Sequence, residues 1–197
     1  MTKTLMLVLS GLFGLLIVTA CNSASGAVIP TPAASPTLQA VESLPTPMSL
    51  SQTVVYHNLQ MTMREAEITT SYLTEFDSTR EPPADKKFIW IHILLKNIGQ
   101  GEQTLPAPEH FSVLNGQTEF KPTYGHRKDH TDYTSLDTSM VQGQEVDAWL
   151  RFDIPVAVEL KDLTFAFLPE STQVSLGFSS SNYSWADHPI YLWNCAQ

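Results

Sequence analysis

Four side chains of types that bind metal ions lie within one short polar stretch, GHRKDHTDY, at residues 125–133. The four are His126, Asp129, His130 and Asp132. Imidazole and carboxylate groups together could bind zinc or another divalent cation. The two histidines are four residues apart in an expected loop, however, with no helix to align them, and the intervening Arg127 and Lys128 would repel a cation. We therefore favour a solvated polar loop over a metal site, and we expect no cofactor.

The sequence lacks the common signatures of catalysis. It contains no Gly-x-Ser-x-Gly elbow, no Gly-rich phosphate-binding loop and no dinucleotide-binding fingerprint. Cys195 could act as a nucleophile only with a distant histidine, and its place near the end of the sequence makes a fixed geometry hard to achieve. His92 alternates with apolar residues, so we expect it to be packed or at an edge. We predict that the protein is not an enzyme.

Aromatic side chains cluster near the end of the sequence. They are Tyr183, Trp185, Tyr191 and Trp193, within eleven residues. Exposed rings at this density are typical of recognition surfaces, because they offer a large and rigid contact area, and a glycan could stack on them. Alternatively, the alternation from Ile190 to Trp193 predicts a last strand packed on the domain. We favour the strand and keep the ligand surface as the alternative for this aromatic tail, residues 179–197.

Composition excludes several classes of protein. The 197 residues are 43% hydrophobic and carry a formal net charge of −9, which suits one modest domain with extensions. This acidic balance argues against binding to nucleic acid, which requires a basic face to replace phosphate counterions. Two cysteines cannot build a disulfide scaffold or a four-cysteine zinc site.

The first residues have the pattern of a secretion signal. Lys3 precedes sixteen uncharged residues, Leu5–Ala20, which is short for a membrane span of about 20 residues but typical of a signal peptide. We therefore assign residues 1–20 to a signal peptide, with an uncleaved membrane anchor as the alternative. A small, polar region rich in proline, serine and threonine follows at residues 21–51, and it predicts a disordered linker.

The end of the signal segment resembles the lipobox of bacterial lipoproteins. The matching residues are Val18-Thr19-Ala20-Cys21. The resemblance implies cleavage before Cys21, a lipid on its thiol and anchoring to a bacterial membrane outside the cytoplasm, since two or three acyl chains give stable attachment. The alternative is a secreted protein with a Cys21–Cys195 disulfide. A Cys195 that stays unpaired outside the cytoplasm would be open to oxidation unless it is buried.

The remaining chain predicts a domain of short strands at residues 52–178. Leu59, Met61 and Met63 alternate with polar residues, and Val146, Ala148, Leu150 and Phe152 do the same. Residues 88–97, FIWIHILLKN, are apolar on both faces, which predicts a central strand covered on both sides. Asn115-Gly116 predicts a two-residue hairpin turn within residues 111–120. Many short strands without a long amphipathic helix indicate an all-β, antiparallel β-sandwich.

This domain resembles a telokin-like, immunoglobulin-like domain of unknown function found in bacterial lipoproteins and secreted antigens. The motifs that carry the resemblance are Lys96-Asn97-x-Gly99, Phe111-x-Val113-Leu114-x-Gly116, Gly143-Gln144, and Trp149-Leu150-x-Phe152-x-Ile154-Pro155, followed by a strand from Leu163 to Pro169. The resemblance implies an immunoglobulin-like fold outside the cytoplasm, and it brings no catalytic residues.

Together these patterns predict a non-catalytic, membrane-anchored extracytoplasmic lipoprotein that presents an immunoglobulin-like binding domain. Its expected partners are the membrane, through the N-terminal lipid, and an extracytoplasmic protein or glycan. Two alternatives stay open. One is a metal-dependent enzyme or factor that uses the His126–Asp132 loop, and the other is a purely structural envelope protein that assembles through the aromatic tail.

Overall fold

A computed structural model describes residues 44–170 and 188–196 of the chain. The predicted signal peptide, Cys21 and most of the predicted linker lie outside these residues, as do Tyr183 and Trp185. No helix in the described part of the chain is both long and apolar enough to cross a membrane.

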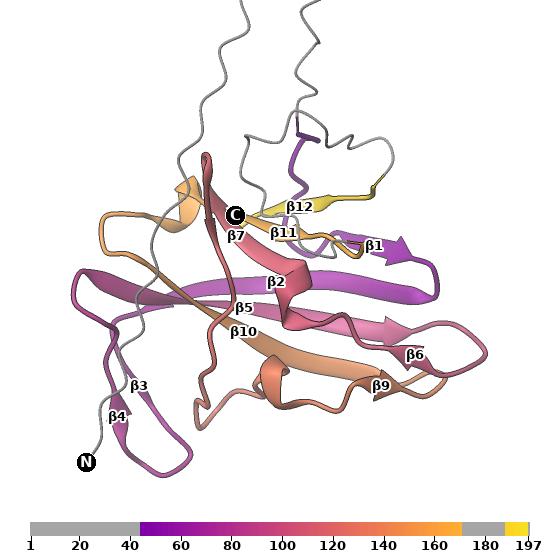
Figure 1. The fold of residues 1–197 in the computed structure, drawn as a ribbon, viewed down its shortest axis with the longest axis horizontal. Coiled ribbons are helices and arrows are strands. Elements are labelled where there is room, and N and C mark those ends of the chain that lie inside the picture. The colour runs from indigo at the N-terminus through magenta and orange to yellow at the C-terminus, as the bar shows by residue number, and fades with distance from the viewer. Residues whose placement is uncertain (1–43, 171–187, 197) are drawn as a thin grey trace, which may run out of the picture. The chain divides into compact units, whose positions relative to one another are not determined.

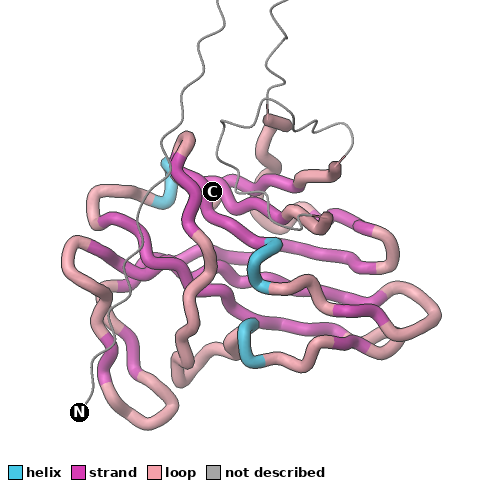
Figure 2. The backbone as a smooth tube through the Cα atoms, in the orientation of Figure 1, coloured by secondary structure: helices cyan, strands magenta, loops and turns pink. Residues whose placement is uncertain are grey.

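The described residues are almost entirely strands and turns (Figure 2). The strands are β1 (Thr53–Tyr56), β2 (Leu59–Thr69), β3 (Tyr72–Leu73), β4 (Thr79–Arg80), β5 (Lys86–Asn97), β6 (Gln103–Thr104), β7 (Phe111–Asn115), β8 (Thr118–Phe120), β9 (Ser139–Met140), β10 (Glu145–Pro155), β11 (Thr164–Phe167) and β12 (Tyr191–Asn194). The short 3-10 helices are η1 (Pro108–His110), η2 (Tyr133–Ser135) and η3 (Leu160–Asp162).

Two four-stranded antiparallel sheets form the body of the domain (Figure 1). The first has the strand order β1-β2-β5-β10 and the second has the order β12-β11-β7-β8. Two further pairs, β3 with β4 and β6 with β9, form small hairpin-like additions. The predicted all-β, antiparallel β-sandwich is therefore confirmed.

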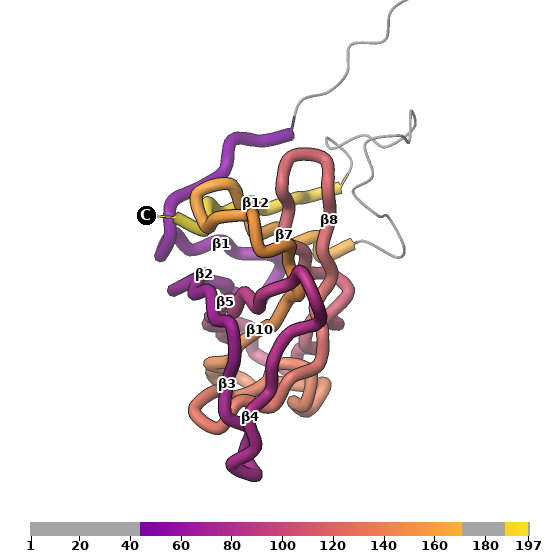
Figure 3. The backbone as a smooth tube through the Cα atoms, turned by 90° about the vertical axis from the view of Figure 1, so that its left-hand side faces the viewer, coloured from indigo at the N-terminus to yellow at the C-terminus, as the bar shows by residue number. Residues whose placement is uncertain are grey.

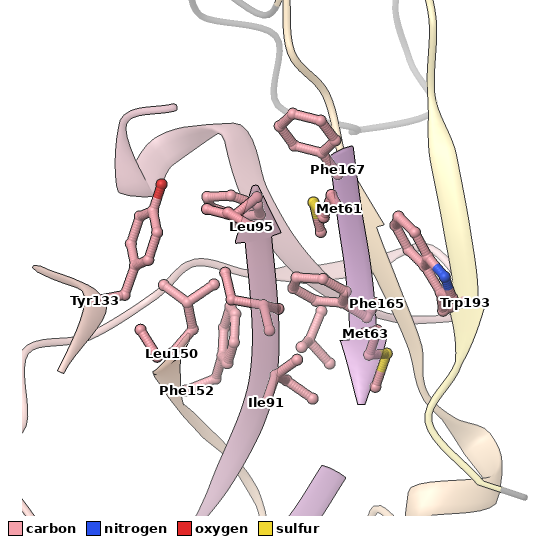
Figure 4. Packing of buried hydrophobic residues seen from close by; sticks show 14 of the residues in the cluster. Met61, Met63, Ile91, Leu95, Tyr133, Leu150, Phe152, Phe165, Phe167 and Trp193 are labelled. Carbon is pink, nitrogen blue, oxygen red and sulfur yellow. The ribbon is translucent and has the colours of Figure 1, made fainter. Parts of the chain in front are cut away.

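The core lies between the two sheets (Figure 4). Alternate residues of β2, β5 and β10 point inward because successive side chains of a strand face opposite sides, so Met61, Ile91 and Leu150 meet Phe165 and Trp193 from the second sheet. The alternation predicted for β2 and β10 is confirmed, since each of the predicted apolar residues is buried. Pro155 ends β10, as expected for a residue with no backbone donor.

A bulge changes the orientation of the second half of β2. The pairing with β5 runs from Met63 opposite Ile93 directly to Glu65 opposite His92, so Arg64 is an extra residue. The inward face passes from odd-numbered residues before the bulge to Ala66 and Ile68 after it. As a result Glu65 and Glu67 point to the outer face of the sheet, which the alternation of residues 59–63 does not predict.

The outer face of β5 is covered only over its first half. Phe88 and Trp90 are 2% and 1% exposed, whereas His92, Leu94 and Lys96 are only partly buried. The prediction of a central strand covered on both faces is thus right for residues 88–91 and wrong beyond them. The cover consists of the β3–β4 hairpin and the loop that leads to η2, which contact Phe88 and Trp90 through Tyr72 and His130.

The β7–β8 turn lies one residue later than predicted. Asn115 pairs with Thr118 as the last strand residue, so the two turn residues are Gly116 and Gln117. Gly116 has a φ of 56°, and Gln117 does not have a positive φ. This places glycine first in the turn, as in a type II′ hairpin, rather than second after an asparagine.

Asn97 holds the end of β5 to two neighbouring turns. It is fully buried, its Nδ2 donates to the carbonyl oxygens of Gly101 (2.7 Å) and Met140 (2.9 Å), and its Oδ1 accepts from the backbone N–H of Gly99 (2.9 Å). A Cβ on Gly99 would lie 2.8 Å from Asn58, so this position needs glycine for space. The Asn97-x-Gly99 motif therefore has a structural role at this end of the sandwich.

The last strand joins the second sheet. β12 pairs with β11, and Trp193 is fully buried with its Nε1 donating to the carbonyl oxygen of Gln52 (2.9 Å). Met48 lies on the other side of β12, where its N–H donates to Leu192 (2.7 Å) and its carbonyl accepts from Asn194 (2.8 Å). Cys195 follows directly and is 2% exposed.

Replacing Asn97 should unfold the domain at lower denaturant concentration. Asn97→Ala removes the side-chain bonds to one buried carbonyl, one part-buried carbonyl and one buried N–H, and we expect a loss of about 3 kcal/mol in the free energy of unfolding. Urea unfolding followed by tryptophan fluorescence measures it. Asn194→Ala is the control, because Asn194 is exposed in β12. Equal stabilities of the two variants would contradict the role given to Asn97.

The Cys195 thiol should be unreactive in the folded protein. Burial raises its pKa from 9.0 to about 12, so very little thiolate is present at pH 8. In a Cys21→Ser variant, we expect a thiol reagent to label Cys195 about a hundredfold or more slowly in buffer than in denaturant. Because the folded pKa is the higher one, the neutral thiol stabilises the fold below pH 9.0 and this contribution is lost as the pH rises toward 12. Rapid labelling in buffer would contradict the burial.

Candidate functional site

A cleft of about 570 Å3 opens beside the covered half of β5. The β3–β4 hairpin forms one wall, and residues 124–126 form another. The floor is made by Phe88 of β5 and by Arg151 and Asp153 of β10. The volume lies within the range of about 300–1,000 Å3 that is usual for small-molecule sites. The cleft is therefore the candidate functional site.

The hairpin wall is built on aromatic packing and a tight turn. Tyr72 packs its ring edge against Phe88 and Trp90, with centroid distances of 5.2 and 5.1 Å. The turn is closed by the N–H of Thr74, which donates to the Ser78 carbonyl (2.9 Å), and by a hydroxyl contact of 2.7 Å between the same residues. Because Tyr72 and Arg80 are directly opposite in the pair, their side chains share the face that lines the cleft.

The segment from Thr123 to His130 is fastened to both neighbouring structures. The Thr123 N–H donates to the Arg151 carbonyl (2.7 Å), which holds this segment along the edge of β10. The Lys128 N–H donates to the Leu73 carbonyl (2.9 Å), and Lys128 Nζ forms an ion pair with Asp77 in the hairpin turn. The two walls are thus linked to each other through Lys128. Figure 3 shows β3 and β4 projecting at one end of the domain.

Arg151 is held rigidly at the floor. Its guanidinium carbon lies 4.9 Å from the centre of the Phe88 ring, and its side chain is only 14% exposed. Nε donates to Thr123 Oγ1 (3.0 Å) and Nη1 donates to the Tyr72 hydroxyl (2.8 Å), whereas Nη2 has no hydrogen bond to any described residue. Three of the five guanidinium N–H groups are consequently left for a ligand.

A carboxylate lies beside this guanidinium. Asp153 Oδ1 is 3.6 Å from Arg151 Nε and accepts a hydrogen bond from Thr123 Oγ1 (3.3 Å). This side of the guanidinium is therefore occupied, and the free donors lie on the Nη2 side. Gly125 gives the guanidinium its space, because a Cβ there would lie 2.6 Å from Nη1.

The rim of the cleft carries exposed aromatic rings and charges. Phe76 is 82% exposed and Tyr124 is 63% exposed, with the Tyr124 ring set edge-on to His126 at 4.5 Å. Arg80, Glu75 and Glu81 are exposed around the same opening. The site therefore combines flat apolar surfaces at its mouth with a fixed cation at its floor.

The four weak metal-ligand candidates of the polar loop lie in two separate pairs, His126 with Asp132 and His130 with Asp129. His126 lines the cleft, and its Nδ1 lies 3.9 Å from Asp132 Oδ2. Asp132 is buried and accepts hydrogen bonds from the N–H and hydroxyl of Thr134 (both 2.9 Å), so it begins η2 as an N-cap. Burial opposes ionisation of Asp129, but the hydrogen bond with Arg127, a backbone hydrogen bond and the charges of Arg127 and His130 together outweigh it and lower the pKa of this carboxyl.

His130 points away from His126, onto the outer face of the first sheet. Its ring stacks on Trp149 at 3.9 Å, and its Nε2 lies 3.2 Å from Glu67 Oε1. His92 stacks on the other face of Trp149 at 4.4 Å. Within the described residues, no group of three or more histidine, cysteine or acidic side chains is arranged to hold a metal ion.

The described end of the aromatic tail, residues 188–196, contributes to the core. Trp193 is fully buried and Tyr191 is partly buried, with its hydroxyl donating to the Val55 carbonyl (3.4 Å). Residues 191–194 form the strand β12, which is the favoured interpretation, and the alternative in which Trp193 offers its ring to a ligand is wrong because that ring is buried. Tyr183 and Trp185 of the same prediction lie outside the described residues.

The main cleft residues were not singled out from the sequence. Arg151 and Asp153 belong to the alternating polar face of β10, which predicts only contact with solvent. Tyr72, Phe76 and Arg80 lie in a stretch without a strong period. The sequence offers one weak signal for the cleft, which is Phe76, a large apolar residue beside Asp77 in a turn.

Filling the space at Gly125 should loosen the floor of the cleft. In Gly125→Ala the new Cβ displaces Arg151, which then loses its hydrogen bond to Tyr72, and we expect a loss of about 1–2 kcal/mol in the free energy of unfolding. Gly101→Ala is the matched control, since nothing lies within 4 Å of its Cβ position. Denaturant unfolding compares them. Equal effects of the two substitutions would show that Arg151 is free to move.

Comparison with known proteins finds similar solved structures and one matching family model. A comparison with curated proteins found none that matches the chain. Among solved structures, the chain is similar to the yjhA protein from Bacillus subtilis, with 15% identity, coverage of 74% of this chain and 97% of that chain, and a TM-score of 0.49. It is also similar to an uncharacterized beta-sandwich protein from Clostridium difficile 630, with 11% identity, coverage of 77% and 96%, and a TM-score of 0.46.

A protein-family model matches the chain over residues 48–172, which is more than half of its length. The matched segment begins at Met48 beside β12 and includes every strand from β1 to β11. It therefore contains the whole floor and both walls of the cleft. The chain belongs to the family described as a domain of unknown function, DUF4352.

Proposed function

We propose that this chain is a non-catalytic binding module, tethered outside the cytoplasm of a bacterium by a lipid on Cys21, whose cleft binds part of an extracytoplasmic protein or glycan. The observation that carries the binding role is the cleft of about 570 Å3 with Arg151 at its floor. A site of this size with a few fixed polar groups and aromatic walls is typical of ligand binding. The tether is inferred from the lipobox resemblance and the apolar segment before it.

The rigidity of the cleft floor supports binding rather than a purely structural role. Contacts with Thr123, Tyr72 and Phe88 fix Arg151 at the floor of the cleft. This position costs the guanidinium solvation free energy that an exposed side chain would keep. A group held in one orientation before the ligand arrives loses little entropy on binding. The two exposed rings at the mouth, Phe76 and Tyr124, contribute contact area that the core does not use.

The entry of the chain into the domain suits a tether. Residues 44–50 run beside β12, and the β3–β4 hairpin projects from the opposite end of the sandwich (Figures 1 and 3). The linker therefore joins the domain at the end that lies away from the β3–β4 hairpin, which forms one wall of the cleft. This separation leaves the cleft free to reach a ligand on the cell exterior.

The geometry favours this function over the two alternatives. A metal-dependent enzyme would need the imidazoles of His126 and His130 near one another, but one lines the cleft and the other is stacked on Trp149. Assembly through the aromatic tail would need exposed rings, and Trp193 is fully buried. Asp153, the carboxylate at the floor, is engaged by Thr123 and Arg151, so it is poorly placed to act as a base.

Lipidation at Cys21 is directly testable in cells. Bacteria that express the full chain with labelled palmitate should incorporate label into it, and the protein should require detergent for extraction from membranes. Cys21→Ser should abolish both properties. Cys195→Ala is the matched control and should keep both, because it removes the other cysteine. An unlabelled protein, or label that persists in Cys21→Ser, would contradict the tether.

A further inference from the structure

We propose that the cleft binds a carboxylate-bearing sugar residue of an acidic polysaccharide, with the carboxylate on Arg151 and the sugar ring against Tyr124 and Phe76. The inference rests on the proposed binding function and names the chemical class of its ligand. Three features support it: the free hydrogen-bond donors of the cleft, the positions of its aromatic rings and the kinds of ligand that its walls exclude.

The carboxylate position follows from the free donors of Arg151. The Nε side is taken by Thr123 and Asp153, and one Nη1 hydrogen is taken by Tyr72. The remaining N–H groups are the two of Nη2 and the second one of Nη1, and two parallel N–H groups of a planar guanidinium form a fork. Such a fork matches the two oxygens of a carboxylate, and charge-assisted pairs of this kind are about twice as strong as neutral hydrogen bonds.

The position of the charges favours an anionic group at depth. Arg151 is 14% exposed at the floor, whereas Glu75 and Glu81 are exposed at the rim, where water screens them. Asp153 is also part-buried, but it lies on the Nε side of the guanidinium. Arg80 adds a second cation on the same wall as Tyr72. A ligand carboxylate that reaches the floor therefore lies closer to Arg151 than to the exposed rim carboxylates, and Arg80 offsets part of their charge at the opening.

The rest of the lining suits a sugar ring. Tyr124 and Phe76 present exposed rings at the mouth, and the carbon-bound hydrogens of one sugar face could pack on them. Glu75, Glu81 and the Ser78 hydroxyl can accept hydrogen bonds from ring hydroxyls. A peptide strand is less suitable, because β4 offers only two residues of edge for backbone pairing.

The test compares two oligosaccharides that differ only in charge. Trigalacturonic acid and neutral galactotriose are titrated by calorimetry into the full chain, extracted and purified in detergent. We expect the acidic trimer to bind about tenfold or more tightly, and its affinity to fall when sodium chloride is raised from 0.1 to 0.5 M. Equal affinities for the two trimers, or no dependence on salt, would overturn the assignment of the carboxylate to Arg151.

Variants locate the binding in the cleft. Arg151→Lys keeps the charge but loses the planar fork, and we expect affinity for trigalacturonic acid to fall about tenfold. If this variant is unstable, the exposed variants Arg80→Gln and Tyr124→Ala serve instead, and each should weaken binding several-fold. Arg64→Gln is the control, because Arg64 lies on the outer face of β2 and pairs with Asp147. Loss of binding in the control, or full binding by every cleft variant, would overturn the proposal.

Failure of this inference and failure of the proposed function give different results. If neither trimer binds but a photo-cross-linker at position 124 captures an extracytoplasmic protein on intact cells, the sugar class is wrong and the binding function stands. If trigalacturonic acid binds and is cleaved, the sugar class stands and the non-catalytic function is wrong. If neither trimer binds and nothing is captured, both are overturned.

Discussion

The structure depends on the need to cover the apolar outer face of β5. This strand is central in the first sheet, with β2 and β10 on its two sides, so Phe88 and Trp90 point outward where no second sheet lies over them. Burying two large aromatic side chains is strongly favourable, at about 1.5–3 kcal/mol for a side chain such as Phe88. The β3–β4 hairpin and the loop before η2 supply the cover, from opposite sides. The cleft is the space that these two covers leave between them.

The two ends of the covering loop have contrasting roles. At its His130 end the loop closes over the sheet, because the imidazole stacks on Trp149 and the other face of that indole is taken by His92. At its His126 end the loop lines the cleft, and the lack of a side chain at Gly125 leaves room for the Arg151 guanidinium. Glu67 connects to the closed end only because the bulge at Arg64 turns it outward. A single extra residue in β2 thus decides which part of the loop can be fastened to the sheet.

The strands could be predicted from the sequence, whereas the cleft could not. The period of two in β2 and β10 and the apolar run of β5 are local signals, and the structure confirms them with the Asn97-x-Gly99 turn at the end of β5. The β7–β8 turn was displaced by one residue, since cross-strand pairing of Asn115 with Thr118 overrides the local preference of Asn-Gly. The cleft joins residues 72–88 to residues 124–153, and its key cation is buried only because a distant hairpin packs against it. A periodic pattern within one strand cannot predict burial that depends on contact with a segment distant in the sequence.

The attachment of Met48 to β12 has a mechanical consequence. If the lipid is fixed in the membrane and the bound ligand is fixed outside the cell, a pulling force acts on the domain between Leu44 and the hairpin end. Met48 then carries the load through its backbone bonds to Leu192 and Asn194, and it runs parallel to β12. Bonds of a parallel pair that is pulled along its length resist together rather than one after another. In a domain tethered in this way, the short segment before β1 would clamp the tether to the sandwich, and Trp193, whose indole N–H donates to the Gln52 carbonyl, would anchor that clamp in the core.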